Sequence, residues 1–153
     1  MPVILLSLGI ILLDQVSKHW ITLKFSPGET LPVIPGFFDI AYVRNTGAAW
    51  GMLGGFTGML VVISLAVLVI LIVFRRSFLS DSLIHRLALG LMVGGIVGNL
   101  LDRVRFQYVV DFLDFHWQIH HFPAFNVADS AICVGVGLYV LSSFFPAADK
   151  PAG

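Results

Sequence analysis

Apolar runs separated by short polar stretches dominate this chain, and four of them approach the length at which a helix crosses a hydrocarbon core, about 20 residues. The second run, FTGMLVVISLAVLVILIVF, carries no charge and is followed by Arg75 and Arg76. No basic segment precedes the first run and no A-x-A-like cleavage site follows it, so we interpret it as a retained membrane helix. The pattern predicts four transmembrane helices, at residues 3–22, 56–74, 84–101 and 125–145.

Two longer polar segments, 23–55 and 102–124, lie between these runs. An even number of spans places both segments on one side of the membrane and both termini on the other. Proline and glycine interrupt short β-favouring runs such as Phe38–Val43, which predicts a small β-rich cradle outside the membrane. Residues 104–124 are rich in aromatic side chains, which favours a short segment at the interface between lipid and water.

Small residues recur at four-residue spacing in the third run, at Gly90, Gly94 and Gly98. This spacing puts them on one face of a helix and predicts close packing against a neighbouring helix. We therefore expect a mainly α-helical membrane fold, with all of residues 1–153 in a single membrane-embedded domain.

Composition excludes an ordinary soluble protein. Apolar residues make up 58% of the chain and charged residues 12%, and the mean hydropathy is +0.93, whereas soluble domains are about a quarter charged. The net charge of zero offers no basic surface for nucleic acid, so no nucleic-acid partner is expected. The single cysteine, Cys133, excludes an intrachain disulfide framework and a cysteine-based zinc site.

The acidic residues are distributed unevenly. Four of the nine lie between Gly98 and Ser130, at the ends of two apolar runs, and carboxylates there are costly unless they have partners or a function. These four are Asp102, Asp111, Asp114 and Asp129.

Local structural roles compete with chemical ones for some of these residues. Asn126 and Asp129 have the i, i+3 spacing of a helix N-cap and its capping partner. Asp102 is followed directly by Arg103, which offers a local ion pair near Asn99 at the end of a helix.

Asp111 is flanked by Val110 and Phe112, where a solvated role is less natural, although a turn exposing both Asp111 and Asp114 to water is an alternative. Asp14 and Lys18 have the spacing and order of a favourable helical ion pair. Lys18 could instead extend towards lipid headgroups.

Several catalytic chemistries fit poorly. His116, His120 and His121 lie near the acids, but the chain holds no H-E-x-x-H motif, and no G-x-S-x-G accompanies Ser130. A pair of carboxyl groups held close together remains: one keeps its proton and donates it, while the ionised partner accepts a proton from water. Such a mechanism needs no metal and no cofactor.

Five short motifs occur in order between the predicted spans, and together they resemble lipoprotein signal peptidase, or signal peptidase II, of bacteria. The resemblance implies an aspartyl intramembrane protease that cleaves prolipoproteins just before a diacylglyceryl-modified cysteine. It also implies the bacterial cytoplasmic (inner) membrane, with both termini cytoplasmic, the active site near the outer face, and membrane lipid around a monomer. The motifs are DQVSK at 14–18, RNTGAAWG at 44–51, GNLLDR at 98–103, VVDFLDFHW at 109–117 and FPAFNVADS at 122–130.

The resemblance maps a catalytic pair onto Asp111 and Asp129. It also implies supporting or substrate-binding roles for other residues in these motifs. Asp102 competes for a catalytic role, and we prefer Asp111 because Arg103 is a ready structural partner for Asp102. The supporting residues are Asp14, Asn45, Asn99, Asp102, Arg103 and Asn126.

A non-enzymatic membrane protein, such as a small transporter or an assembly factor, is the alternative. Its acids would form an ion path and should occur at depth in several spans. Here they gather at one level, near the ends of the apolar runs, which favours the peptidase.

Overall fold

The computed structural model describes residues 2–48, 52–75, 82–117 and 120–144. Arg76, at the end of the second apolar run, and Trp50, in the RNTGAAWG motif, lie outside the described residues.

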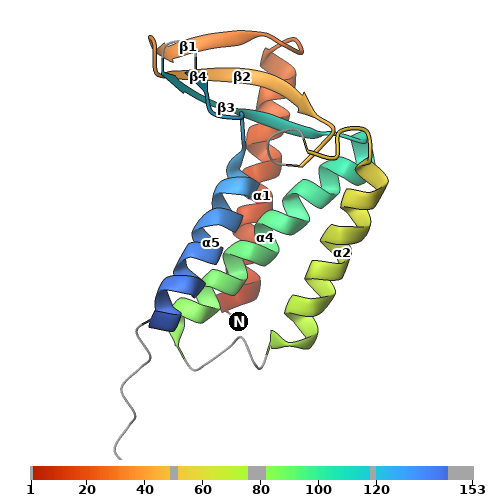
Figure 1. Cartoon of the computed structure of the whole chain (residues 1–153), viewed down its shortest axis with the longest axis vertical. Coiled ribbons are helices and arrows are strands. Elements are labelled where there is room, and N and C mark those ends of the chain that lie inside the picture. Colours follow the sequence, from red (N-terminus) through yellow and green to blue (C-terminus); the bar gives the residue numbers. More distant parts are fainter. Residues whose placement is uncertain (1, 49–51, 76–81, 118–119, 145–153) are drawn as a thin grey trace, which may run out of the picture.

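A helix is present at each of the four predicted positions: α1 (Pro2–Lys24), α2 (Thr57–Val73), α4 (Leu83–Phe106) and α5 (Val127–Phe144). The helix α4 extends beyond the predicted end of its span at residue 101. Figure 1 shows α1, α4 and α5 side by side, with α2 next to α4 and a small sheet across one end of the bundle. Two of the helices, over Val3–Lys24 and Leu83–Phe106, are both long and apolar enough to cross a membrane, and the other two are shorter apolar helices.

α4 lies between α1 and α5, and its glycines allow both contacts, as their spacing predicts. A Cβ atom on Gly94 would lie 2.8 Å from the Cβ atom of Ile10 on α1. A Cβ atom on Gly95 would collide with the main-chain carbonyl of Ala128 on α5. Any larger residue at these positions would push the helices apart.

Apolar side chains cover the outer surface of the bundle. Leu12 on α1 is 66% exposed and Val62 on α2 is 65% exposed, and many neighbours on both helices are about half exposed. Such a surface needs an apolar environment, because soluble proteins rarely expose contiguous apolar patches of this extent. The structure thus has the outer surface of a membrane protein.

The sheet is antiparallel with strand order β1-β2-β3-β4. The predicted β-rich cradle within residues 23–55 is confirmed, since it supplies the first two strands. The strands are β1 (Thr30–Ile34), β2 (Phe38–Asn45), β3 (Val109–Trp117) and β4 (His120–His121).

Residues 104–124, predicted to form a short interfacial segment, contain the end of α4 and the strands β3 and β4, and their place at the membrane interface stays a prediction. α4 continues to Phe106 and ends at Gln107, which has a left-handed backbone conformation with a φ of 64°. The chain then turns into β3, an inner strand of the sheet. Val110 and Phe112 are two residues apart and therefore lie on the same face of β3, where they pack against Ile21 of α1. This burial stabilises the strand.

Candidate functional site

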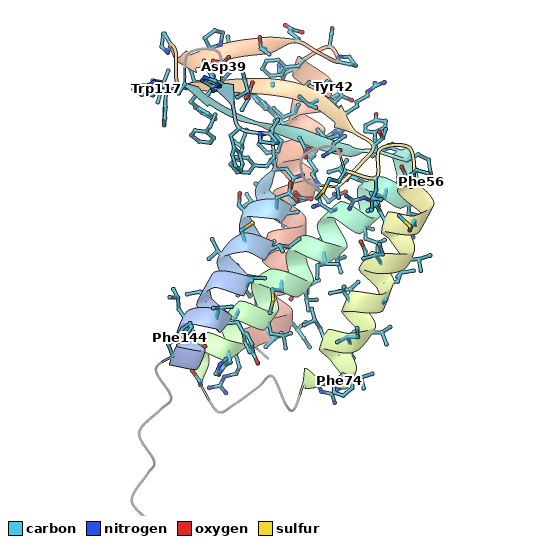
Figure 2. The ribbon with its side chains drawn as sticks, viewed as in Figure 1. Asp39, Tyr42, Phe56, Phe74, Trp117 and Phe144 are labelled. Atoms are coloured by element: carbon cyan, nitrogen blue, oxygen red, sulfur yellow. The ribbon has the colours of Figure 1, made fainter. Side chains whose placement is uncertain are left out.

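A cavity of about 840 Å³ lies where the sheet meets α4 and α5, and it is lined by both predicted catalytic aspartates. Figure 2 shows side chains filling the zone between the sheet and the helices, between Phe56 at the start of α2 and Trp117 at the far end of β3. Asn45, Asn99 and Arg103 also line this cavity, as does the segment Phe122–Phe125 before α5. Four elements, β2, α4, β3 and α5, therefore contribute polar side chains to one space.

Asp111 lies on β3 opposite Val43 of β2, and only 2% of its surface is exposed. Its Oδ2 atom accepts a hydrogen bond from Nδ2 of Asn45 at 2.9 Å, and its Oδ1 atom accepts one from Nδ2 of Asn126 at 2.7 Å. Burial, together with the negative charge of Asp129, raises the pKa of Asp111 to about 7. Asp111 is therefore protonated at mildly acidic pH and partly protonated at neutral pH.

Asp129 lies in the first turn of α5. Its Oδ1 atom accepts a hydrogen bond from Nδ2 of Asn99 at 2.7 Å. Its Oδ2 atom accepts one from the main-chain N–H of Asn126 at 3.2 Å, while Oδ1 of Asn126 accepts one from the N–H of Asp129 at 3.0 Å. This reciprocal pair of hydrogen bonds is a capping box. Asn126 and Asp129 therefore cap α5, as one prediction had it, and also lie at the predicted site.

Asn126 is completely buried and connects the two aspartates, because its side chain binds Asp111 while its main chain binds Asp129. Asn99 receives hydrogen bonds at its Oδ1 atom from Lys18, at 2.9 Å, and from Asn126, at 3.2 Å. These bonds direct the Nδ2 group of Asn99 towards Asp129. The amides thus hold both carboxylates in fixed positions.

The expected pair between Asp102 and Arg103 is wrong. The Oδ2 atom of Asp102 lies 3.1 Å from Nζ of Lys18 and accepts the main-chain N–H of Val110 at 3.1 Å. Arg103 instead donates to the carbonyl of Gly47 at 3.2 Å and lines the cavity. Asp102 is not among the residues that line this cavity, and its partner Lys18 lies on α1.

The ion pair predicted between Asp14 and Lys18 is present, with 2.9 Å between Oδ2 and Nζ. Lys18 is only 3% exposed, so it does not extend towards headgroups. Asp14 also accepts the main-chain N–H of Ala128 at 3.0 Å, which joins α1 to the start of α5. The helical spacing of Asp14 and Lys18 indicated the first of these contacts. The contacts of Lys18 with Asp102 and Asn99 join residues distant in the sequence, and no local pattern signals them.

Asp114 and the histidines lie apart from this site. His121 Nδ1 lies 3.1 Å from Oδ1 of Asp114, and His116 Nε2 lies 3.4 Å from Oδ1 of Asp39. The alternative of a turn exposing both Asp111 and Asp114 to water is wrong, since Asp111 is buried. Within the described residues no group of three or more histidine, cysteine, aspartate or glutamate side chains is arranged to hold a metal ion.

The fold and the site together define a small helical membrane protein with an acid-lined cavity at one end of its bundle. Two solved structures share this fold, and both are described as bacterial membrane enzymes. One, determined in meso at 2.3 Å resolution, has a TM-score of 0.88 and 33% identity, covering 99% of this chain and 94% of the other. The second, at 1.9 Å, has a TM-score of 0.83 and 34% identity, covering 95% and 94%.

The sequence pattern of the signal peptidase (SPase) II family matches residues 6–145 of this chain. A lipoprotein signal peptidase of Syntrophotalea carbinolica is 46% identical over 144 residues, which cover 92% of this chain and 89% of that protein. One of Moorella thermoacetica is 43% identical over 150 residues, covering 98% and 97%. The chain belongs to the signal peptidase II family and is a bacterial membrane protease.

Proposed function

We propose that this protease removes signal peptides from prolipoproteins by an aspartic mechanism, cutting before a cysteine that carries diacylglycerol. Asp111 and Asp129 form its catalytic pair. The observation that carries this proposal is that both carboxylates line one cavity and both are hydrogen bonded to Asn126. The names of the relatives support prolipoproteins as the substrate.

The two acids divide the proton transfers. Asp129 accepts a proton from a water molecule, and the oxygen of that water attacks the carbonyl carbon of the scissile peptide bond. Asp111, whose raised pKa of about 7 keeps it partly protonated at neutral pH, donates its proton to the carbonyl oxygen. The proton on Asp129 then passes to the leaving nitrogen as the carbon–nitrogen bond breaks. One hydroxyl of the tetrahedral intermediate returns a proton to Asp111, which restores the starting state of the pair, so no metal and no cofactor are needed.

The surrounding polar groups position this pair. Asn45 and Asn126 hold Asp111, while Asn99 holds Asp129. Arg103 lines the cavity, where its positive charge favours the partial negative charge that develops on the scissile carbonyl oxygen as water attacks. Asp14 and Asp102 act indirectly, since they fix Lys18 and the ends of α1, α4 and α5.

The proposed membrane arrangement has all four helices crossing the bacterial cytoplasmic membrane. Both termini are cytoplasmic, and the sheet and cavity lie at the outer face. The apolar outer surfaces of α1 and α2 support this arrangement. Acyl chains of the substrate cysteine lie against the apolar helices, where their burial contributes to binding. The chain works as a monomer, because its own residues supply the whole catalytic pair.

Purified protein incubated with a diacylglyceryl-modified precursor tests the proposal. Asp111→Asn and Asp129→Asn should each remain folded and lose cleavage by a factor of at least about 10³, because each leaves the pair without one acid. Asp114→Asn is the matched control, since Asp114 lies on the same strand but binds His121 away from the cavity. A chelator should leave the rate unchanged.

Full activity in either pair variant would overturn the assignment of the catalytic residues. Loss of activity on chelation, with recovery on adding zinc, would favour a metalloprotease. Absence of any cleavage by the wild-type protein would favour the transporter or assembly factor. That alternative is weaker because the buried acids gather at one end of the bundle rather than along its depth.

A further inference from the structure

The segment Phe122–Phe125 forms one wall of the cavity. One of its edges is hydrogen bonded to β3. The N–H of Phe122 donates to the carbonyl of Phe115 at 2.8 Å, and Phe125 exchanges two main-chain bonds with Leu113, at 2.9 and 3.1 Å. The segment is thus held in place along the sheet like a short additional strand.

Ala124 has free main-chain groups on this wall. Neither its N–H nor its carbonyl has a partner within residues 2–48, 52–75, 82–117 and 120–144, and the residue is only partly buried. Phe125 directs both of its main-chain groups to β3, so strand alternation directs those of Ala124 to the other side. Pro123 has no N–H, which leaves Ala124 as the donor of this stretch.

Gly47 also lines the cavity but offers no free main-chain groups. Gly47 donates its N–H to Oδ1 of Asn45 at 2.8 Å, and its carbonyl accepts a bond from Arg103 at 3.2 Å. Its main-chain groups are therefore already used. A peptide in the cavity finds a free donor and a free acceptor together on the wall of Ala124. Unpaired main-chain groups that line a cavity favour a ligand that satisfies them.

We infer that Ala124 binds the main chain of the substrate as an added strand, which rests on the proposed function. One residue of the precursor, within a few positions of the scissile bond, donates its N–H to the carbonyl of Ala124 and accepts the N–H of Ala124. Ala124 lies two residues before Asn126, which holds both aspartates, so this pairing places an extended peptide next to the catalytic pair.

Pairing of this kind explains how one site accepts precursors with different side chains. Main-chain hydrogen bonds provide affinity and orientation that do not depend on the side chains of the precursor. Ala124 and Pro123 have small side chains, which leave enough space for the main chain of a substrate to approach that of Ala124. The pairing also orients the scissile carbonyl, because an added strand fixes the direction of every peptide plane in it.

Two kinds of backbone change test this inference in the full-length protein. Ala124→Pro removes the N–H, whereas Ala124→Ser keeps it, and kcat/KM for a diacylglyceryl-modified precursor peptide is compared between these variants. A set of precursor peptides with one backbone amide replaced by an ester then removes each substrate N–H in turn, leaving the scissile amide intact. Both tests change hydrogen bonds without changing charge.

We expect Ala124→Pro to have kcat/KM about tenfold below Ala124→Ser, which is the scale of one lost hydrogen bond. One ester substitution should lower kcat/KM of the wild type by a similar factor. The same ester should lower kcat/KM of Ala124→Pro by less, because the loss of one of the two hydrogen bonds to Ala124 weakens the other. Equal values for the two variants, or an ester set in which no position loses more than twofold, would overturn the inference.

If Ala124→Pro fails to fold, the set of ester-containing precursors tests the inference with the wild-type protein. Failure of the proposed function has a different signature, because the wild type would then not cleave the all-amide precursor, or Asp111→Asn would cleave it.

Discussion

Asn126 donates its side-chain amide to Oδ1 of Asp111 at 2.7 Å, across the junction between α5 and β3. The same residue caps α5, because its own Oδ1 atom accepts the N–H of Asp129 at 3.0 Å. One buried side chain therefore fixes a helix end and a strand relative to each other, and through them the two proposed catalytic acids.

The two bonds of Asn126 can be separated by substitution. Asn126→Ser keeps a capping oxygen but loses the amide donor, so Asp111 should move and kcat/KM should fall about 100-fold. The cap is retained, so we expect the free energy of unfolding to fall by no more than ~2 kcal/mol. Asn126→Ala loses the cap as well and should cost ~1 kcal/mol more. Precursor cleavage and thermal unfolding measure both effects, and wild-type cleavage by Asn126→Ser would contradict the role of the amide.

The raised pKa of Asp111, about 7, predicts a pH dependence of activity. Proton donation to the substrate requires protonated Asp111, so kcat/KM should fall above pH 7, by about tenfold per pH unit. A profile that stays flat between pH 7 and pH 9 would show that Asp111 does not act as the acid.

The same group predicts a pH dependence of stability. Its pKa rises from an ordinary 3.8 to about 7 on folding, so the folded state holds a proton that the unfolded state releases. Asp111 therefore contributes stability that is fully present below about pH 4 and is lost as pH rises towards 7. We expect the wild-type Tm to fall over this interval, and to fall less in Asp111→Asn. Equal slopes for the two proteins would contradict this account.

The helices could be predicted from the sequence because long apolar runs have few alternatives in a membrane. The end of α4 was the exception. The charged residues Asp102, Arg103 and Arg105 indicated an exit from the apolar core, and the backbone nevertheless stays helical through them to Phe106. The hydropathy pattern indicates where the apolar part of a helix ends. The helix itself ends at its C-cap residue, which for α4 is Gln107.

The strand β3 and the partner of Asp102 could not be predicted, for a related reason. β3 forms because β2, distant in the sequence, pairs with it, and its aromatic composition fits an interfacial segment equally well. Asp102 binds Lys18 on another helix rather than its neighbour Arg103. Both features depend on contacts between segments that are distant in the sequence. The motifs, in contrast, indicated Asp111 and Asp129, which the structure brings into one cavity.

Lys18 is the only cation that the described residues place between Asp14 and Asp102, at 2.9 and 3.1 Å. Lys18→Met leaves both buried carboxylates without a counter-charge and should lower the free energy of unfolding by ~3–5 kcal/mol. Lys24→Met, at the exposed end of the same helix, is the matched control and should change it by less than ~0.5 kcal/mol.

Removing the two carboxylates together with Lys18 tests whether the loss of charge balance causes this destabilisation. Adding Asp14→Asn and Asp102→Asn to Lys18→Met should recover part of the lost Tm, because the carboxylates no longer need a partner. Cleavage should stay below wild type in this triple variant, since Asn99 has lost the bond that orients it. A Lys18→Met protein as stable as Lys24→Met would show that the buried ion pairs contribute little.

Cys133 provides a direct test of where the substrate lies. It is the single cysteine of the chain, its thiol is exposed, and it lines the cavity one helical turn beyond Asp129. A maleimide adduct there would fill space next to the catalytic pair, so kcat/KM should fall at least about tenfold, the equivalent of 1.4 kcal/mol. Excess precursor should slow the labelling, and Cys133→Ser should be unaffected by the reagent. A small disulfide-forming thiol reagent should inhibit reversibly, with activity restored by reduction. Complete labelling without loss of cleavage would place the substrate elsewhere.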